Sequence, residues 1–496
     1  MRCLALALEW SATGGEAVFC GRIESDFLRR QIESAGFRML DTGPEIDDTL
    51  DVLGRHDLAG SWLVLDGYHF GPEWQERLVE EGYRVVALDD GARLPRYAAN
   101  VILAPEHEAS PVRYSASPST VILAGSRYRL MRPGFSGCHS KVPRPDTGAV
   151  LLVSFGGADT CNATRDTVLG LDHVLGPEDL VLIILGPVNP NEALVLEALR
   201  QVGFRHELHR SVADMAGMYA RADLAISAGG GGAWELAATG VPAILVPVAE
   251  NQKPGTAHLV ASGAAVNLDS PDQIRSDAFP HLVRQLLAVE PRLREMAARA
   301  MKVCDGKGAA RVCRIIRNLE DPAGSIEAHL RLAEPGDMEQ VFLLASDPAV
   351  RENSFSPEPI ALREHEKWFA SRVGSPATAF YVFEIDGLIV ALARFDVTDD
   401  GAETDLAVHP AFRGRGLGAQ ILCRTAAAAA TKLGVASLRA VVFEKNLSSM
   451  HSFTRGGFTN AGRQRIRNKD CVVFRWELAK AGAAPDESLR ATSAFG

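Results

Sequence analysis

The chain has 496 residues, more than one hydrophobic core usually serves, so its length predicts about three domains. A formal net charge of -10 argues against a nucleic-acid partner. The eight cysteines are scattered without CxxC pairs, so neither a zinc site nor a disulfide framework is indicated, and we expect no metal. No apolar run has the length of a membrane span, and the N-terminus lacks the anatomy of a signal peptide. We therefore expect a cytoplasmic protein without a membrane partner.

Helices and strands alternate through the first part of the chain. The expected helices are 3–10, 26–35, 47–54 and 72–81, and the expected strands are 16–20, 37–40, 62–66 and 84–89. This alternation predicts a parallel sheet flanked by helices. Asp66-Gly67-Tyr68 and Asp89-Asp90-Gly91 each follow a strand, at the edge where open α/β sheets bind ligands. Ordinary turn chemistry is the alternative for either motif, because Asp and Gly are common in turns everywhere.

A second alternating region follows two further strands, expected at 101–103 and 121–124, and a polar stretch, 136–148, that reads as an interdomain linker. It opens with strand 149–155, which ends in Gly156-Gly157 ahead of helix 163–171. Strand 180–185 and helix 192–202 come next. The region therefore predicts a second parallel α/β domain with a glycine turn after its first strand.

The centre of this second region is the stretch 223–252, which predicts a strand, four glycines, a helix and a second strand. Gly229, Gly230, Gly231 and Gly232 precede the helix, so backbone N–H groups can converge on an anion at its positive end. Glu235 lies one turn into the helix, where a carboxylate can accept hydrogen bonds from a ribose. Asn251 and Gln252 follow the second strand at its carboxyl end. Together they favour a nucleoside-diphosphate site over a tight turn of small residues.

The third region begins after a helical segment, 291–317, that is broken at 305–308. We expect strands at 328–332, 380–385, 388–395, 404–409, 437–443 and 472–478, and helices at 339–344, 360–372, 417–433 and 447–455. Asp386-Gly387 is a two-residue hairpin turn signal. Residues 479–496 are small and polar, and we expect them to be disordered.

Two motifs in this third region resemble the GNAT family of N-acetyltransferases. The first, Arg413-x-x-Gly416-x-Gly418, opens a helix after a strand, and the second begins at Asn446 and ends in Gly457-Phe458. Backbone N–H groups around such glycines can bind a pyrophosphate, although a generic phosphate-binding or packing turn is the alternative. The resemblance covers residues 328–478 and implies acetyl-CoA as co-substrate. It implies a cofactor site made of Val408, Arg413, Gly414, Arg415, Gly416, Leu417, Gly418 and Asn446.

The chain departs from the family at Phe453, where many members have a tyrosine that protonates the departing thiolate. Phenylalanine has no proton to donate, so another group or water must do so. Glu403 or His409 could serve as general base, although a lone acid or histidine near a strand end is more often structural.

The motifs of the first two regions, taken in order, resemble the UDP-2,4-diacetamido-2,4,6-trideoxy-β-L-altropyranose hydrolases of pseudaminic acid biosynthesis. That resemblance implies a glycosyltransferase-B-like pair of Rossmann-like domains, at 1–140 and 141–320, and inverting attack of water on the anomeric carbon with release of UDP. It places Gly229–Gly232 and the Gly156-Gly157 turn at the diphosphate, and Glu235 at the ribose. Asn251 and Gln252 would face the sugar and the diphosphate, with Tyr68 on the opposite wall, and Asn251 and Tyr68 are our catalytic candidates.

The two resemblances together predict a bifunctional enzyme. In the implied pathway a GNAT enzyme acetylates the 4-amino group of the UDP-sugar just before hydrolysis, and its early signature is similar to 360–368, which contains His365 and Trp368. The hydrolase family begins with a strand and a Gly-x-Gly-His turn, which would precede Met1 here. We therefore expect either a start further upstream or a first half that binds UDP-sugar without cleaving it. A glycosyltransferase with a lipid or protein acceptor is a third interpretation, and the sugar stereochemistry and the oligomeric state stay open.

Overall fold

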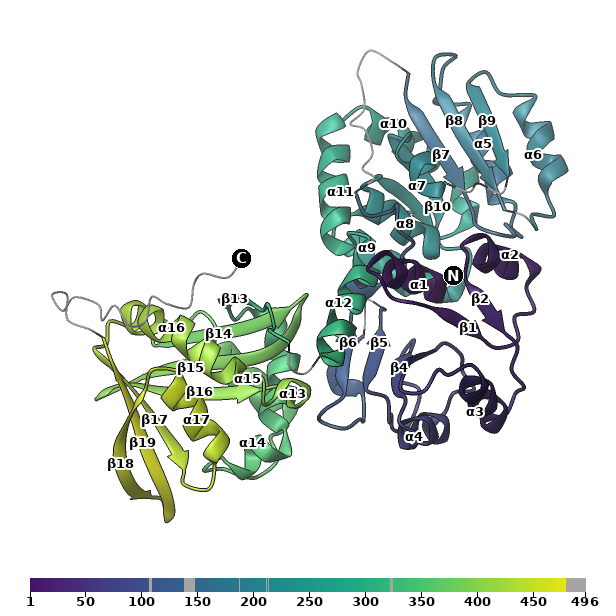
Figure 1. Ribbon diagram of the computed structural model, residues 1–496. Coiled ribbons are helices and arrows are strands. Elements are labelled where there is room, and N and C mark those ends of the chain that lie inside the picture. The colour runs from purple at the N-terminus through teal and green to yellow at the C-terminus, as the bar shows by residue number, and fades with distance from the viewer. Residues whose placement is uncertain are drawn as a thin grey trace. The chain divides into compact units, whose positions relative to one another are not determined.

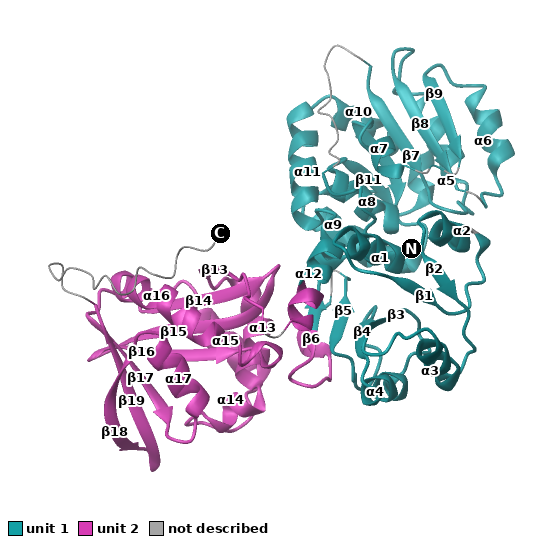
Figure 2. Ribbon diagram, in the orientation of Figure 1, with its two compact units in different colours: residues 1–110, 122–314 teal, residues 111–121, 315–496 magenta. Residues whose placement is uncertain are grey.

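The computed structural model describes residues 1–106, 109–137, 148–186, 188–210, 212, 214–321 and 324–478. The chain divides into two compact units, residues 1–110 with 122–314 and residues 111–121 with 315–496 (Figure 2). The first unit holds both of the predicted parallel α/β regions, and the second holds the predicted acetyltransferase region. Most of the predicted linker, residues 138–147, and the predicted disordered tail, 479–496, lie outside the described residues.

The first α/β region of unit 1 contains two separate parallel sheets. One pairs β1 with β2, and the other has the order β3-β4-β5-β6. The strands are β1 (Val18–Cys20), β2 (Arg38–Leu40), β3 (Trp62–Leu65), β4 (Arg84–Leu88), β5 (Val101–Ala104) and β6 (Val121–Ala124). The helices are α1 (Arg2–Ala12), α2 (Asp26–Ser34), α3 (Ile46–Arg55) and α4 (Pro72–Glu80). Within the described residues, β1 and β3 each have a neighbouring strand on one side only.

The second α/β region of unit 1 is one six-stranded parallel sheet of order β12-β11-β10-β7-β8-β9 (Figure 1). Its strands are β7 (Val150–Ser154), β8 (Leu180–Leu185), β9 (Arg205–Arg210), β10 (Leu224–Ala228), β11 (Ala243–Val246) and β12 (Ala265–Asn267). The helices are α5 (Ala163–Leu171), α6 (Glu192–Leu199), α7 (Met215–Tyr219), α8 (Gly231–Thr239), α9 (Lys253–Ala261), α10 (Ala278–Leu287) and α11 (Glu290–Val303), and α12 (Gly308–Glu320) runs from unit 1 into unit 2. The predicted break at 305–308 separates α11 from α12.

Helices cover both faces of this sheet, which is why its inner strands, β7, β8, β10 and β11, are largely apolar. Alternate residues of β7 enter different cores: Leu151 and Val153 pack in one, and Leu152 packs in the other. The strand order changes direction between β7 and β10. The chain continues from β7 to β8 on one side of this pair, and from β10 to β11 on the other side. The turns after β7 and β10 flank this switch point, which is the usual ligand position of an open α/β sheet.

Unit 2 is built on a mixed seven-stranded sheet of order β13-β14-β15-β16-β17-β19-β18. Its strands are β13 (His329–Leu332), β14 (Thr378–Ile385), β15 (Leu388–Thr398), β16 (Gly401–Val408), β17 (Ser437–Phe443), β18 (Thr459–Ile466) and β19 (Lys469–Glu477). The helices are α13 (Met338–Ser346), α14 (Pro348–Glu352), α15 (Leu362–Arg372), α16 (Leu417–Leu433) and α17 (Leu447–Arg455). Ile385 pairs with Leu388 across Asp386-Gly387, which confirms the predicted two-residue hairpin.

Three strands of the structure were not predicted: β9, β12 and β18. All three lie at the edge of a sheet, β12 has only three residues, and β9 and β18 carry charged and polar residues along most of their length. None of the helices in the described part of the chain combines the length and the apolar character that a membrane span requires.

Candidate functional sites

A cavity of about 990 Å³ opens in unit 2 between β16 and β17. These strands run parallel but pair only at Ala402 with Leu438 and at Glu403 with Arg439. Beyond Glu403 they separate, so the second half of β16 has no strand on that side. The gap leaves room for an extended ligand beside β16, and helices α13, α14, α15, α16 and α17 supply the other walls.

Most of the predicted acetyl-CoA residues lie in the wall of this cavity. They are Val408, Arg413, Gly414, Gly416, Leu417, Gly418 and Asn446. Gly414 and Gly416 have φ of 79° and 75°, in the left-handed region that favours glycine, and Gly416 is the N-cap of the 17-residue helix α16. The first N–H groups of α16 therefore face the cavity, as binding a pyrophosphate requires.

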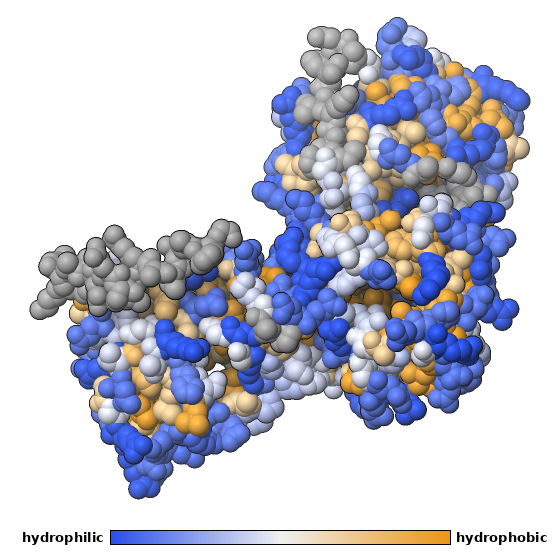
Figure 3. Space-filling view, in the orientation of Figure 1, coloured by the Kyte–Doolittle hydropathy of each residue, from blue (hydrophilic) through white to orange (hydrophobic). Residues whose placement is uncertain are grey.

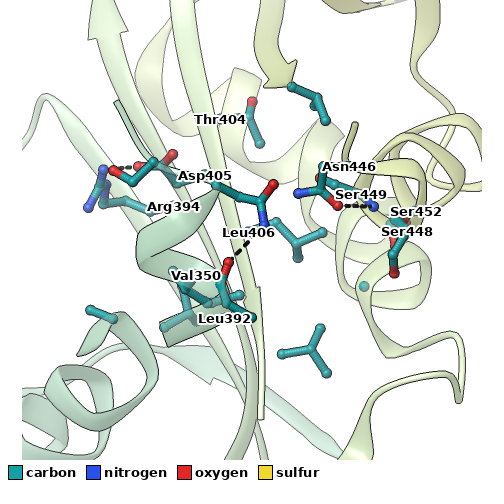
Figure 4. Close-up of a pocket in the computed structure, with 18 of the residues that line it drawn as sticks. Val350, Leu392, Arg394, Thr404, Asp405, Leu406, Asn446, Ser448, Ser449 and Ser452 are labelled. Atoms are coloured by element: carbon teal, nitrogen blue, oxygen red, sulfur yellow. Dashed lines mark hydrogen bonds and ion pairs between the residues drawn. The ribbon is translucent and has the colours of Figure 1, made fainter. Parts of the chain in front are cut away.

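Gly418 is needed for a different reason. A Cβ at this position would lie 2.9 Å from Ser452 Oγ and 3.1 Å from Leu406 Cδ2, so its absence allows α17 to pack closely on α16. Asn446 is the N-cap of α17, and its Oδ1 accepts a hydrogen bond from the backbone N–H of Ser449 at 3.1 Å. The cap holds the start of α17, with its serines, against the cavity (Figure 4).

The two arginines of the predicted motif are held in different places. Arg413 donates from Nη2 to Oδ1 of buried Asp347 at 2.8 Å and from Nε to the carbonyl of Val408 at 3.2 Å. Arg415 is not part of the cavity wall. Its guanidinium donates to the carbonyls of Asn318, at 2.6 Å, and Gly324, at 3.0 Å. The structure thus does not bring Arg415 together with the other predicted cofactor residues.

Aromatic side chains form the part of the cavity wall that comes from α15. His365 is 2% exposed, and its ring lies 5.0 Å from Trp368 and 5.3 Å from Phe342. Burial, with a smaller effect of Arg394, lowers the pKa of His365 to about 4, so the ring is neutral at physiological pH. Its Nε2 is buried and has no hydrogen-bond partner among the described residues. A neutral imidazole in this position could hydrogen-bond a ligand.

The polar end of the cavity is formed by β15 and β16. Glu403 lies in the cavity wall at the point where β16 and β17 separate. Next to it, Arg394 pairs with Asp405 and donates to Asp396 at 2.7 Å, and its guanidinium lies 4.7 Å from the ring of Trp368. Figure 4 shows Thr404 and Leu406 between this ion pair and the α17 serines. No sequence motif predicts the pair of Arg394 and Asp405, because the two residues meet only through the register of β15 against β16.

Phe453 and His409 differ in their relation to the cavity. Phe453 is 3% exposed, lies in the wall, and stacks on Phe474 with ring centroids 5.7 Å apart. His409 is not in the wall; its Nδ1 accepts a hydrogen bond from the backbone N–H of Ala411, and burial lowers its pKa to about 4. Ser448, Ser449 and Ser452 of α17 supply hydroxyl groups to the cavity.

The predicted diphosphate turn of unit 1 lies at the switch point of the six-stranded sheet. Gly230 is the N-cap of α8, and Gly229 is packed so closely that a Cβ would lie 2.1 Å from Thr256 Oγ1. Gln252 is folded over the turn: a Cβ on Gly230 would lie 3.4 Å from its Nε2, and its Oε1 accepts from the N–H of Val248 at 3.0 Å. The structure therefore brings these glycines together with Gln252.

The other predicted residues of unit 1 lie around or away from this turn. Glu235 accepts a 3.3 Å hydrogen bond from the hydroxyl of Tyr219, and burial raises the pKa of its carboxyl. Asn251 is exposed beside Gln252. Gly156, with φ of 79°, and Gly157 follow β7, which pairs with β10. Tyr68 follows β3 and is 75% exposed, with the Arg93 guanidinium 4.3 Å from its ring.

A cluster that was not predicted lies at the ends of β3 and β4. Arg2 donates to Asp66 and to Asp90, each at 2.6 Å, and the thiol of Cys3 lies 3.2 Å from Asp66. The pKa of Asp66 is lowered, because the hydrogen bonds and charge of Arg2 outweigh the effect of burial. The two acidic turns of the sequence are thus joined through the first helix.

Comparison with known proteins separates the two units. Residues 328–459 match the family described as "Acetyltransferase (GNAT) domain". YwnH of Bacillus subtilis, named as a candidate phosphinothricin acetyltransferase, is 30% identical over 141 residues, which are 27% of this chain and 85% of that protein. Through its second unit, the chain belongs to the GNAT acetyltransferases. Acetyl-CoA is therefore the co-substrate of this GNAT domain, and the splayed strands and glycine turn fit it.

The first unit is similar to a glycosyltransferase family and to a protein of polysaccharide biosynthesis. Residues 150–310 match the family described as "Glycosyltransferase family 28 C-terminal domain". The spore coat polysaccharide biosynthesis protein SpsG of Bacillus subtilis is 23% identical over 202 residues, 40% of this chain, and the chain spans 59% of the length of that relative. The crystal structure of MurG from Acinetobacter baumannii aligns with 64% of this chain and 95% of its own, with a TM-score of 0.48 and 15% identity. The two family matches and the parallel sheets of the first unit agree with the predicted fold, a glycosyltransferase-B-like region joined to a GNAT domain.

Proposed function

We propose that the GNAT domain acetylates the amino group of a UDP-linked 4-amino-4,6-dideoxy sugar. The observation that carries this proposal is the fusion itself: one chain holds a GNAT cavity and a family 28 C-terminal domain, a family associated with UDP-sugars. The aromatic wall around Trp368 and the polar end at Glu403 give the cavity the two kinds of surface that a sugar ring requires.

Bound acetyl-CoA supplies an acetyl group activated as a thioester. The glycine turn and the first N–H groups of α16 hold its pyrophosphate, and the unpaired side of β16 and Asn446 position its arm. In the transfer, the amine nitrogen forms a bond to the acetyl carbon, and the bond between that carbon and sulfur breaks. The amine loses one proton and the thiolate gains one.

Glu403 is our candidate for the group that accepts the amine proton, directly or through a water molecule. It is the carboxylate in the wall where the strands separate, beside the position that a thioester on β16 would take. Phe453 has no proton for the thiolate, so the Ser449 hydroxyl or water supplies it. Replacing Glu403 with Gln should lower kcat about 10²- to 10⁴-fold and leave the KM for acetyl-CoA unchanged. Asp405→Asn is the matched control, because that carboxylate is already paired with Arg394.

The substrate is tested by incubating the full chain with acetyl-CoA and a set of amines while the release of free thiol is followed. We expect kcat/KM for the UDP-4-amino sugar to exceed that for phosphinothricin and for spermidine about 100-fold or more. A protein that acetylates phosphinothricin or spermidine best, or leaves the UDP-4-amino sugar unmodified, would show the proposal to be wrong.

We further propose that the first unit hydrolyses the acetylated product, a UDP-2,4-diacetamido-2,4,6-trideoxyhexose, with inversion at the anomeric carbon. In this step, which belongs to pseudaminic acid biosynthesis, water attacks that carbon, the glycosyl C–O bond breaks, and UDP leaves. The glycine turns after β7 and β10 would hold the diphosphate and Glu235 the ribose, with Asn251, Gln252 and Tyr68 toward the sugar. The family 28 match and the position of both turns at the switch point support this proposal.

Release of UDP from the acetylated sugar is the decisive measurement. UDP appearing at a rate that falls in Glu235→Ala would support hydrolysis, because a weaker ribose contact lowers binding of the same substrate. Tight binding of the sugar nucleotide without UDP release would instead make the first unit a module that binds UDP-sugar for the GNAT domain.

A further inference from the structure

The hairpin formed by β18, β19 and the turn between them carries an unusual density of positive charge. Arg463, Arg465, Arg467 and Lys469 lie within seven residues of a chain whose net charge is -10. All four side chains are exposed, and Figure 3 shows a deep blue surface where this hairpin ends. β18 is an edge strand, and charges on edge strands commonly serve only to prevent pairing with other chains. A role in binding therefore needs further observations.

The first such observation is the position of the hairpin turn at the cavity of unit 2. The guanidinium of Arg467 lies 5.4 Å from the ring of Phe355, and Nζ of Lys469 lies 6.0 Å from the ring of Phe443. Both rings are part of the cavity wall, and they meet edge to face with centroids 5.0 Å apart. Two cations of the hairpin thus lie at the rim of the proposed acetylation site.

The second observation is that these two cations have no carboxylate partner. Arg463 pairs with Glu444 at 2.8 Å, and Lys445 pairs with Glu352 at 2.6 Å, so neighbouring cations are neutralised. Within the described residues, no Asp or Glu lies within ion-pair distance of Arg467 or Lys469. Their charge is available to an anionic ligand.

The third observation is the backbone at the turn. Arg467 and Asn468 have φ of 46° and 60°, and Ile466 pairs with Lys469 across them. Such a two-residue turn suits Asn followed by Gly, whereas arginine is disfavoured in the left-handed region. The turn therefore presents a long cationic side chain at a position where folding alone favours a small residue.

We propose that Arg467 and Lys469 bind the diphosphate of the acceptor while its amino sugar lies in the cavity. This inference rests on the proposed function, because it gives the hairpin the anionic part of a nucleoside-diphosphate sugar. The two cations are placed to contact the phosphates without entering the region of the thioester. The GNAT domain then selects a phosphate-bearing amine over the free amino sugar.

Acetyl-CoA also carries phosphates, and the structure offers these a separate place. The glycine turn at Gly414–Gly416 begins α16, whereas Phe355, over which Arg467 lies, comes from the segment between α14 and α15. Separate KM values for acetyl-CoA and for the UDP-4-amino sugar show which of the two substrates the hairpin binds.

The test compares the wild-type chain with the double variant Arg467→Asn/Lys469→Gln. Asparagine removes the charge and also suits the left-handed backbone, so the fold is not put at risk. Arg465→Gln is the matched control, since it removes one charge from the same hairpin at a position with no cavity ring beneath it. Each protein is assayed with the UDP-4-amino sugar, with the free 4-amino sugar, and over a range of acetyl-CoA concentrations.

We expect the double variant to lose roughly 10- to 100-fold in kcat/KM for the UDP-4-amino sugar, mostly through KM, as the loss of two charge-assisted contacts predicts. Its kcat/KM for the free amino sugar and its KM for acetyl-CoA should change less than about twofold, and so should all constants of the control. A rise confined to the KM for acetyl-CoA would assign the hairpin to the cofactor and overturn the inference. Equal kinetic constants for the double variant and the wild type would mean that Arg467 and Lys469 do not bind the acceptor, and would also overturn the inference. A wild-type chain that does not use the UDP-4-amino sugar would overturn the proposed function itself.

Discussion

The glycine turn at the end of β10 allows a sharp test of why its first residue is glycine. A Cβ at Gly229 would lie 2.1 Å from Thr256 Oγ1, whereas its next contacts, the Cβ and carbonyl oxygen of Gln252, would both be an ordinary 3.4 Å away. Gly229 does not have a positive φ, so alanine is allowed by the backbone. Gly229→Ala therefore introduces one specific steric conflict, and Thr256→Ala removes it.

The loss of stability expected in Gly229→Ala follows from the burial of Thr256, which is 1% exposed. Overpacking at a buried site costs about 1–3 kcal/mol, because the neighbouring side chain has no space to move into. The Thr256 hydroxyl has no hydrogen-bond partner among the described residues, so Thr256→Ala alone should cost no more than about 1 kcal/mol of lost apolar burial. The double variant should thus be about 1–2 kcal/mol more stable than Gly229→Ala, a coupling that a double-mutant cycle measures.

The assay is urea unfolding of the full chain, together with calorimetric titration of UDP. We expect Gly229→Ala to weaken UDP binding about tenfold, since a turn displaced from Thr256 no longer points its N–H groups at one position, and we expect the double variant to restore it. Gly231→Ala is the control, because its Cβ would meet no atom within 4 Å. If the double variant were no more stable than Gly229→Ala, and bound UDP no better, the steric reasoning would be refuted.

Two further predictions concern unit 2. Arg415→Gln should destabilise this unit by about 2 kcal/mol through the lost hydrogen bonds to the Asn318 and Gly324 carbonyls, while the KM for acetyl-CoA stays within about twofold; a tenfold rise in that KM would place Arg415 at the cofactor after all. The pKa of His365 is lowered by burial to about 4, so its contribution to stability is complete above the unfolded-state value near 6.5 and is lost as the pH falls toward 4. The free energy of unfolding is therefore measured at about pH 7.5 and about pH 5 for the wild type and for His365→Gln. We expect it to fall by roughly 2 kcal/mol less in the variant than in the wild type. Equal falls would contradict the lowered pKa of His365.

The inner strands of the parallel regions could be predicted from the sequence because they are nearly continuous apolar runs, and glycine turns follow β7 and β10. Alternate residues of such a strand enter the cores on both faces, as Leu151 and Leu152 do, so every position must be apolar. The Asp386-Gly387 hairpin was likewise predictable from local chemistry, since its positive φ angles restrict the choice of residue, whereas Gly229 in the turn before α8 is required by its close packing on Thr256.

Edge strands and side-chain directions could not be predicted in the same way. β18 is exposed along nearly its whole length, so no burial imposes an apolar alternation on residues 459–466. The motif at Arg413–Gly418 predicted the turn correctly but gave no reason for Arg415 to face Asn318, because that contact joins residues 97 positions apart. The ion pair of Arg394 with Asp405 depends on strand register in the same way.

The two sites proposed for the diphosphate of the UDP-sugar differ in how they supply positive charge, and ionic strength should separate them. At the turn before α8, the donors are backbone N–H groups of a packed helix end, whose partial charges are fixed and partly shielded from solvent. At the hairpin, the charges of Arg467 and Lys469 are on exposed side chains, and mobile ions screen exposed charges over about 10 Å at ~0.1 M salt. Raising the salt from about 0.05 M to about 0.5 M should therefore increase the KM of the UDP-4-amino sugar several-fold in the acetylation assay. The dissociation constant of UDP at unit 1 should change much less, and the Arg467→Asn/Lys469→Gln variant should lose most of the salt dependence of its acetylation. Equal salt dependence in variant and wild type would mean that the acceptor phosphates are bound elsewhere in the GNAT domain.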